Sequence, residues 1–125
     1  MNKIKDFTDL EVYQLSLEIS FKIYQLTRKF PKSELFEIVD QLKRSSSSIG
    51  ANIAEGFGRY HRRDFIKFLY NSRGSLNETK HFLTLSEKLG YINKKELDIF
   101  ELDLRNLSVK LNNLIKSIYK SIPDN

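Results

Sequence analysis

The chain has 125 residues, of which 40% are hydrophobic and 30% are charged, and this balance predicts one globular domain over residues 1–125. The absence of cysteine, of an apolar run of about eighteen residues and of a signal-peptide pattern excludes disulfides, cysteine-ligated zinc and a membrane span, so we expect a cytoplasmic protein. Lys and Arg outnumber Asp and Glu by 21 to 16, and the net charge of +5 favours a polyanionic partner.

A first helix is predicted over residues 9–30. The segment Thr8-Asp-Leu-Glu11 has the form of a capping box at its start. Two apolar stripes follow at helical spacing: Leu10, Tyr13, Leu17 and Tyr24 in one, and Val12, Leu15, Ile19, Ile23, Leu26 and Phe30 in the other. Because two stripes need two apolar neighbours, we expect this helix to contact a partner subunit as well as its own core.

A second helix is predicted over residues 33–55, after the break at Pro31 and with Ser33 as its N-cap. Its apolar stripe is Leu35, Val39, Leu42, Ser46, Ile49 and Ile53. The four serines at 45–48 have low helix propensity, so they could form a flexible joint or a phosphorylation site. The stripe runs through Ser46, however, which favours a helix whose small side chains let a neighbour pack closely. Gly56 and Gly58 are expected to end it.

The third and fourth helices are predicted over residues 62–89 and 94–122. The inward residues of the third are Phe65, Phe68, Leu69, Ser72, Leu76, Phe82, Leu83 and Leu89. The fourth starts at the capping box Asn93-Lys-Lys-Glu96 and ends before Pro123, with an apolar stripe of Leu97, Phe100, Leu104, Leu107, Leu111, Leu114 and Ile118. Four such helices with short loops predict an all-α fold, an up-down-up-down antiparallel four-helix bundle.

A line of polar residues follows one face of the second helix and continues on the third. It consists of Gln41, Arg44, Ser48, Asn52 and Glu55, opposite Asn71, Gly74 or Ser75, and Glu78. In an antiparallel pair we expect Arg44 near Ser75 or Glu78, and Ser48 near Asn71. Two interpretations stay open: a seam of hydrogen bonds that fixes the register of the helices, or a ligand or catalytic site.

The sequence carries little that indicates catalysis. Glu78 and His81 have the Glu-x-x-His spacing of di-iron bundles, but such a site needs two pairs, and the other histidine, His61, lies in a predicted loop. We find neither a nucleophile–histidine–acid set nor a glycine-rich phosphate loop. We therefore expect no enzyme, no cofactor and no metal.

A cationic cluster occupies the loop between the second and third helices and the turn after it. It consists of Arg59, Tyr60, His61, Arg62, Arg63 and Lys67. The topology places it at the end of the bundle that holds both termini, with Lys3, Lys5, Lys116 and Lys120 nearby. Arginine and tyrosine suit phosphate contact and base stacking, whereas arginines at a helix N-terminus oppose the helix dipole. The cluster is either a solvated loop with local pairs to Asp64 or Asp9, or a nucleic-acid-binding surface.

Several motifs in combination resemble a known family. They are Gln41-Leu-Lys-Arg44, Ser48-Ile-Gly-Ala-Asn-Ile-Ala-Glu-Gly56, Phe65-x-x-Phe-Leu69, Gly74-Ser-Leu-x-Glu78 and Leu89-Gly-Tyr-Ile92. Over nearly the whole chain they resemble the four-helix-bundle proteins encoded in intervening sequences of bacterial 23S ribosomal RNA genes, once labelled S23 ribosomal protein. That family is similar to the accessory variability protein of diversity-generating retroelements, a basic, barrel-like pentamer that binds a reverse transcriptase and nucleic acid.

The resemblance implies a homo-oligomer, with a pentamer favoured, and no established enzymatic activity. It also implies that the polar line is a family feature at Arg44, Ser48, Asn52, Glu55, Ser75 and Glu78. The serines at 45–47, Asn71 with Ser72, and His61 depart from the small or more apolar residues usual in the family. We expect a non-enzymatic module that binds RNA or another nucleic acid. The alternative is a protein-interaction scaffold, for example an accessory subunit to a reverse transcriptase.

Overall fold

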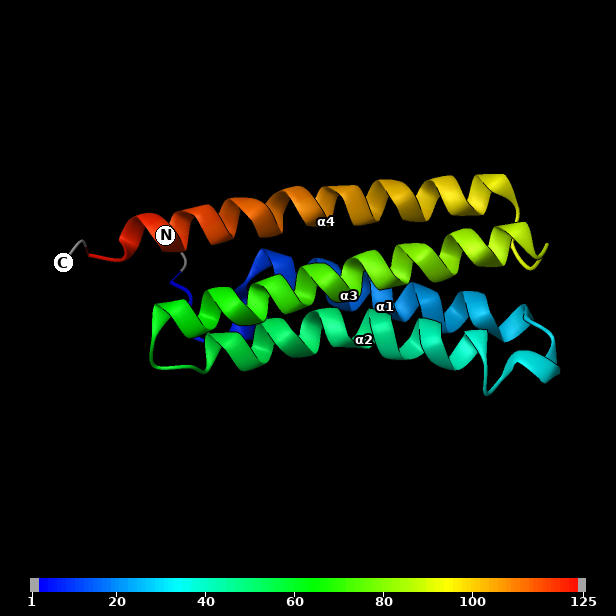
Figure 1. Cartoon of the computed structure of the whole chain (residues 1–125), viewed down its shortest axis with the longest axis horizontal. Coiled ribbons are helices and arrows are strands. Elements are labelled where there is room, and N and C mark those ends of the chain that lie inside the picture. The colour runs from blue at the N-terminus through cyan, green and yellow to red at the C-terminus, as the bar shows by residue number, and fades with distance from the viewer. Residues whose placement is uncertain (1–2, 124–125) are drawn as a thin grey trace.

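The computed structural model describes residues 3–123, so both ends of the predicted domain 1–125 lie outside the described residues. The helices are α1 (Glu11–Leu26), α2 (Ile38–Phe57), α3 (Arg62–Lys88) and α4 (Lys94–Ser121), with short 3₁₀ turns η1 (Phe7–Asp9), η2 (Thr27–Lys29) and η3 (Lys32–Glu34). Over these residues there is no strand. Each helix packs antiparallel against the next, and α1 also contacts α4 (Figure 1). The predicted all-α, up-down-up-down arrangement is confirmed.

The core lies along the long axis of the bundle, and all four helices contribute to it. Its fully buried aliphatic side chains are Ile23, Leu42, Ile49, Ile53, Leu69, Leu83, Leu104, Leu107 and Leu111. Burying one such side chain contributes about 1.5–3 kcal/mol, so these stripes account for most of the drive to fold. No helix within residues 3–123 is long and apolar enough to cross a membrane.

The serine run lies in the middle of α2 and is helical, as its period predicted. Ser45 and Ser46 are buried, and Thr79 of α3 donates a hydrogen bond to Ser45 Oγ at 2.9 Å. Ser72 donates to the carbonyl oxygen of Ile49 at 2.7 Å. Short hydroxyl side chains thus let α2 and α3 approach closely and satisfy each other's polar atoms.

The start of α1 differs from the predicted capping box. Thr8 lies in η1, where its hydroxyl donates to Asp6 Oδ2 at 2.7 Å instead of capping a helix. The carboxylate of Asp9 accepts the N–H groups of Lys5 and Asp6 at 2.9 and 3.1 Å. These local bonds favour a separate 3₁₀ turn, so α1 begins only at Glu11.

The start of α2 also differs, because the segment after Pro31 forms η3. Ser33 is inside that turn and caps nothing, and α2 begins at Ile38. Tyr91 donates a hydrogen bond to Glu34 Oε2 at 2.6 Å, which holds η3 against the turn before α4. Leu35 directly follows η3 and Leu89 directly follows α3, and both of these predicted inward residues are exposed, by 47% and 48%.

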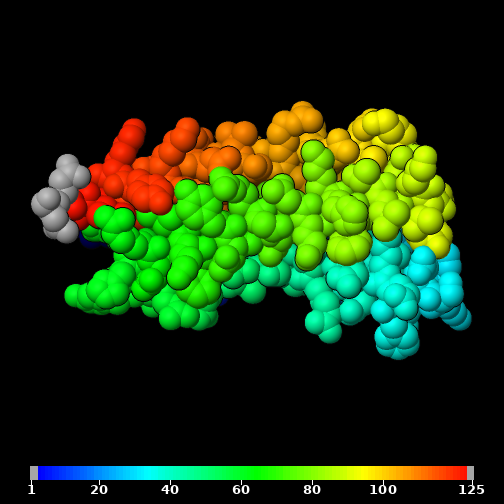
Figure 2. All heavy atoms as spheres, viewed as in Figure 1, coloured from blue at the N-terminus to red at the C-terminus, as the bar shows by residue number. Residues whose placement is uncertain are grey.

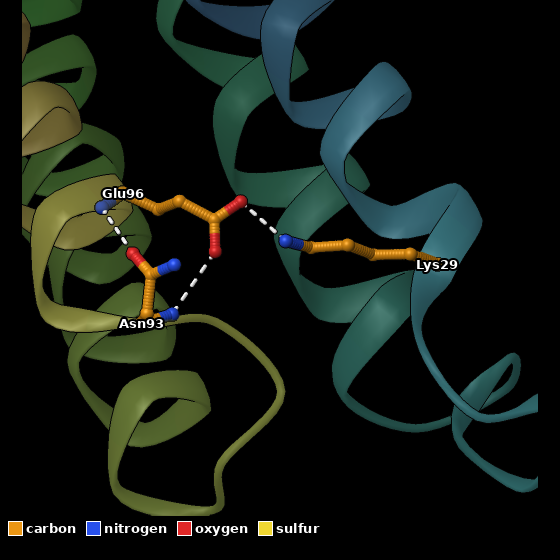
Figure 3. A network of polar contacts seen from close by, with 3 residues as sticks. All are labelled: Lys29, Asn93 and Glu96. Atoms are coloured by element: carbon orange, nitrogen blue, oxygen red, sulfur yellow. Dashed lines mark hydrogen bonds and ion pairs between the residues drawn. The ribbon is translucent and has the colours of Figure 1, made fainter.

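The predicted capping box at the start of α4 is confirmed. Asn93 Oδ1 accepts the N–H of Glu96 at 2.8 Å, and Glu96 Oε1 accepts the N–H of Asn93 at 3.0 Å. The second oxygen of Glu96 pairs with Lys29, which follows α1 (Figure 3). The hydrogen bonds from Lys29 and Asn93 lower the pKa of Glu96.

Candidate nucleic-acid interface

The turn between α2 and α3 lies at the end of the bundle where α4 also finishes and the described chain begins (Figure 1). Tyr60 at its tip is 94% exposed, and its ring meets that of His61 edge-on at 4.9 Å. In the space-filling view the turn projects beside the last residues of α4 (Figure 2). Between them is an open depression lined by Tyr60, His61, Arg62, Arg63, Asp64, Ile122 and Pro123.

Two of the three arginines of this turn are engaged within the chain. Arg59 pairs with Glu55 Oε1 at 2.7 Å, and its guanidinium lies over the ring of Phe68, 4.7 Å from the centroid. Arg62 Nη1 donates to the carbonyl oxygen of Ser121 at 2.8 Å, which ties the turn to α4. Arg59 is thus electrically compensated, whereas Arg62 keeps its charge beside a neutral acceptor.

Arg63 and Lys67 differ from Arg59, because within residues 3–123 neither has a carboxylate within 4.0 Å. Both are exposed on the first turns of α3. The N-cap residue His61 makes no side-chain hydrogen bond there, and Asp64 is the acidic residue of the first turn. Arginines at a helix N-terminus cost roughly 0.3–1 kcal/mol each against the dipole, so helix stability does not explain this arrangement.

Three further residues beside the cluster were not singled out by the sequence analysis: Tyr70 and Arg73 on α3, and Tyr119 on α4. The guanidinium of Arg73 lies over the Tyr70 ring, 4.7 Å from its centroid. On α3, Arg63, Lys67 and Tyr70 are spaced four and three residues apart, so they share one face of the helix. This spacing is the sequence signal that could have identified Tyr70.

Part of the predicted polar line comes together between α2 and α3. Ser75 donates to Ser48 Oγ at 3.0 Å, and Asn52 Nδ2 donates to the carbonyl oxygen and the hydroxyl of Ser48 at 2.9 and 3.0 Å. Ser48 therefore contacts Ser75 instead of the expected Asn71. This offset is about one helical turn. It follows from the register of α2 against α3, which is set by the buried hydrogen bonds Thr79–Ser45 and Ser72–Ile49.

The remaining members of the polar line lie apart. Arg44 pairs with Asp40 at 2.8 Å, four residues back on its own helix, and its side chain is 76% exposed. The expected contact of Arg44 with Ser75 or Glu78 is absent from the described residues, because the nearer carboxylate competes for the guanidinium. Glu55 pairs with Arg59, while Gln41 and Glu78 are exposed.

The Glu-x-x-His pair lies on the outer surface of α3. Glu78 and His81 are both exposed, and the His81 ring meets that of Phe82 edge-on at 5.0 Å. Across the part of the chain that the structure describes, no three His, Cys, Asp or Glu side chains are grouped so that they could hold a metal ion.

The chain is similar to one protein family and to several solved structures. The family described as 23S rRNA-intervening sequence protein matches residues 8–113. A crystal structure from Bacteroides thetaiotaomicron, of a protein with unknown function from the S23 ribosomal protein family, is similar at a TM-score of 0.77 and 31% identity. That similarity covers 84% of this chain and 98% of the other. No curated protein matches this chain.

Proposed function

The chain belongs to the 23S rRNA-intervening sequence protein family, and from this premise we propose that it is a non-enzymatic, oligomeric module that binds RNA or another nucleic acid. The binding surface is the cationic end of the bundle, with Arg62, Arg63 and Lys67 contacting phosphates and Tyr60 and His61 flanking them. Arg59 supports the turn through Glu55 and Phe68. The solved relative is described as having unknown function, so the proposal depends on this chain's own charges.

The observation that carries the proposal is the concentration of cations after α2: Arg59, Arg62, Arg63 and Lys67 lie within nine residues whose one acid is Asp64. Six cations of the described residues have an acidic partner within 4.0 Å, in the pairs Lys22–Asp103, Lys29–Glu96, Arg44–Asp40, Arg59–Glu55, Lys94–Asp98 and Lys110–Glu11. Over the described residues Arg63 and Lys67 are among the cations that have none, and Arg63 lies in the first turn of α3, where the helix dipole disfavours positive charge. A polyanion would neutralise them and release counterions from its own phosphates.

The test is the salt dependence of RNA binding by a double variant, Arg63→Gln with Lys67→Gln. We expect weaker binding and a slope of log affinity against log salt that falls by about one for each phosphate that is no longer neutralised. Lys88→Gln with Lys95→Gln is the matched control, because it removes the same charge from exposed positions at the other end of the bundle. Equal reductions of affinity in the two variants, or no wild-type binding at about 50 mM salt, would contradict the proposal.

The proposed assembly is a homo-oligomer, with a pentamer favoured, and the outer face of α1 supports it. Leu17 and Phe21 are each 56% exposed and Tyr24 is 43% exposed, on one side of a helix whose other side is in the core. Leu17 also borders a shallow groove between α1 and α2, with Ser47 and Ala51 on its other side. A contiguous apolar surface of this kind is typical of a protein contact.

The same face favours one alternative function, a protein-interaction scaffold such as an accessory subunit to a reverse transcriptase. Light scattering distinguishes the two. An oligomer has a mass several times the 14.7 kDa of one chain, because copies of the chain cover the α1 face. A stable monomer that binds no RNA would leave this face free for another protein and would favour the scaffold.

A further inference from the structure

Beside the cationic end, α3 and α4 lie side by side (Figure 1), and each carries an exposed tyrosine there. Tyr70 on α3 is 39% exposed and Tyr119 on α4 is 47% exposed. A hydrogen bond with the Tyr70 hydroxyl raises the pKa of the Tyr119 phenol, and the nearby charge of Arg63 acts in the opposite direction. Two hydrogen bonds join this stretch of α3 and α4, from Arg62 to the carbonyl oxygen of Ser121 and from Arg73 to Asn112, and both tyrosines and Arg63 lie between them.

The Tyr70 ring is held in place by Arg73. The guanidinium lies over the ring, 4.7 Å from its centroid, and Nη1 donates to Asn112 Oδ1 on α4 at 3.1 Å. One face of the ring is thus covered by a cation that is itself fixed across the helix pair. A ring oriented in this way loses little conformational freedom when a flat ligand stacks on its open side.

The surroundings of the two tyrosines are strongly basic. Residues 104–121 of α4 contain four cations and no acid: Arg105, Lys110, Lys116 and Lys120. Residues 62–77 of α3 contain Arg62, Arg63, Lys67 and Arg73 against Asp64 alone. Lys110 pairs with Glu11, but over residues 3–123 no carboxylate lies within 4.0 Å of Lys116. Aromatic rings among uncompensated cations are typical of surfaces that bind unpaired bases.

We propose that this α3–α4 face is a stacking platform for single-stranded nucleic acid, formed by Arg63, Lys67, Tyr70, Arg73, Lys116 and Tyr119. Two adjacent bases stack on the tyrosine rings, and the phosphates that join them lie on Arg63, Lys67 and Lys116. A duplex keeps its base faces inside the stack, so it can use the cations but not the rings. The inference deepens the proposed function and rests on it, because it names the strand state that the cationic end selects.

The experiment compares two RNA probes by fluorescence anisotropy: a labelled oligouridylate of about ten nucleotides and a duplex of the same length. In Tyr70→Leu and Tyr119→Leu we expect affinity for the single strand to fall at least roughly 5-fold per ring, with little change for the duplex. Tyr70→Phe and Tyr119→Phe retain the rings and most of the affinity. Phe36→Leu, at an 86% exposed aromatic residue near the other end, leaves binding unchanged.

A second measurement needs no variant. The chain has no tryptophan, so its intrinsic fluorescence comes from its six tyrosines. Saturation with oligouridylate should quench part of this emission, because stacked bases contact two of those rings. Unchanged emission at saturation would overturn the platform even if the leucine variants failed to fold.

The outcomes separate the platform from the proposed function. If the leucine variants bind oligouridylate like the wild type while Arg63→Gln with Lys67→Gln loses affinity, the platform is wrong and nucleic-acid binding stands. If the wild type binds neither probe, the proposed function fails and the platform with it. If the leucine variants change the mass measured by light scattering, or polyglutamate competes as well as oligouridylate, the face is a protein-contact surface and the platform is overturned.

Discussion

Two glycines inside helices occupy opposite environments. A Cβ at Gly56 would lie 2.7 Å from Phe68 Cβ and 2.9 Å from Phe65 Cδ1, so the missing side chain lets α3 approach α2 just before the turn. A Cβ at Gly74 on α3 would meet nothing within 4 Å. Gly56 therefore serves packing, whereas within a single chain Gly74 only weakens its helix.

The same substitution should accordingly act with opposite sign at the two sites. We expect Gly74→Ala to stabilise the protein by about 0.5–1 kcal/mol, because alanine restricts the unfolded chain and favours the helix. Gly56→Ala should destabilise it by roughly 1–3 kcal/mol, because Phe65 and Phe68 must move. Urea unfolding followed by circular dichroism measures both, and a loss of stability in Gly74→Ala would contradict the open surface seen there.

At the scale of the secondary-structure elements, the Glu96 carboxylate at the start of α4 makes two stabilising interactions. Glu96 caps its own helix by accepting the N–H of Asn93 at 3.0 Å, and it pairs with Lys29 beyond the end of α1. Lys29 and Glu96 are 48% and 28% exposed, so solvent screens the pair and it contributes only about 0.2–1 kcal/mol. The two contributions can be separated by the choice of substitution.

Glu96→Gln retains an acceptor for the N–H of Asn93 and loses only the charge, whereas Glu96→Ala loses both and should cost about 1 kcal/mol more. The pKa of Glu96 is lowered in the folded state. Its contribution is therefore present above the unfolded value of about 4.3 and is lost as the pH falls through the folded value. Thermal unfolding between pH 7 and pH 3 should show a smaller loss of stability in Glu96→Gln than in the wild type. Parallel curves for the two proteins would exclude a role for this charge.

The elements also show what the sequence could and could not predict. The stripes of α2 and α4, the capping box at Asn93 and the helical serine run follow from periodicity and local hydrogen bonding, which act over a few residues. Thr8 and Ser33 were predicted to lie at helix starts, but each lies in a 3₁₀ turn. The same local hydrogen-bonding rules allow either structure. The register of α2 against α3 is set by Thr79 on Ser45, a contact between distant residues that neither helix encodes alone.

The candidate site also has a part that the sequence could predict and a part that it could not. The cluster from Arg59 to Lys67 is contiguous in the chain, so its composition was enough to suggest a polyanion surface. Tyr70 and Tyr119 meet only because α3 and α4 lie side by side. Glu55 neutralises the charge of Arg59. The four-residue spacing allows this ion pair, but only the side-chain positions show that it forms.

At the scale of the whole molecule, the α1 face decides whether one bundle is the functional unit. Leu17 and Tyr24 belong to the apolar stripe that the core leaves exposed here, and Phe21 lies on the same side of the helix. A large apolar side chain gains about 1.5–3 kcal/mol when it becomes fully buried, and every subunit of a closed ring would gain this contribution. We therefore expect the wild type to scatter light as an assembly well above 14.7 kDa.

The double variant Leu17→Glu with Phe21→Glu should break that assembly, because burying an unpaired carboxylate costs several kcal/mol. Its mass should fall to that of one chain, and its helical circular dichroism should persist, because both side chains are exposed in the isolated bundle. Leu102→Glu is the control at a 62% exposed leucine on α4, and it should leave the mass unchanged. A wild type of monomer mass, or a double variant of undiminished mass, would show that α1 is not the subunit contact. RNA affinity of the monomeric variant then separates the contribution of one cationic end from the multivalent gain of several held together.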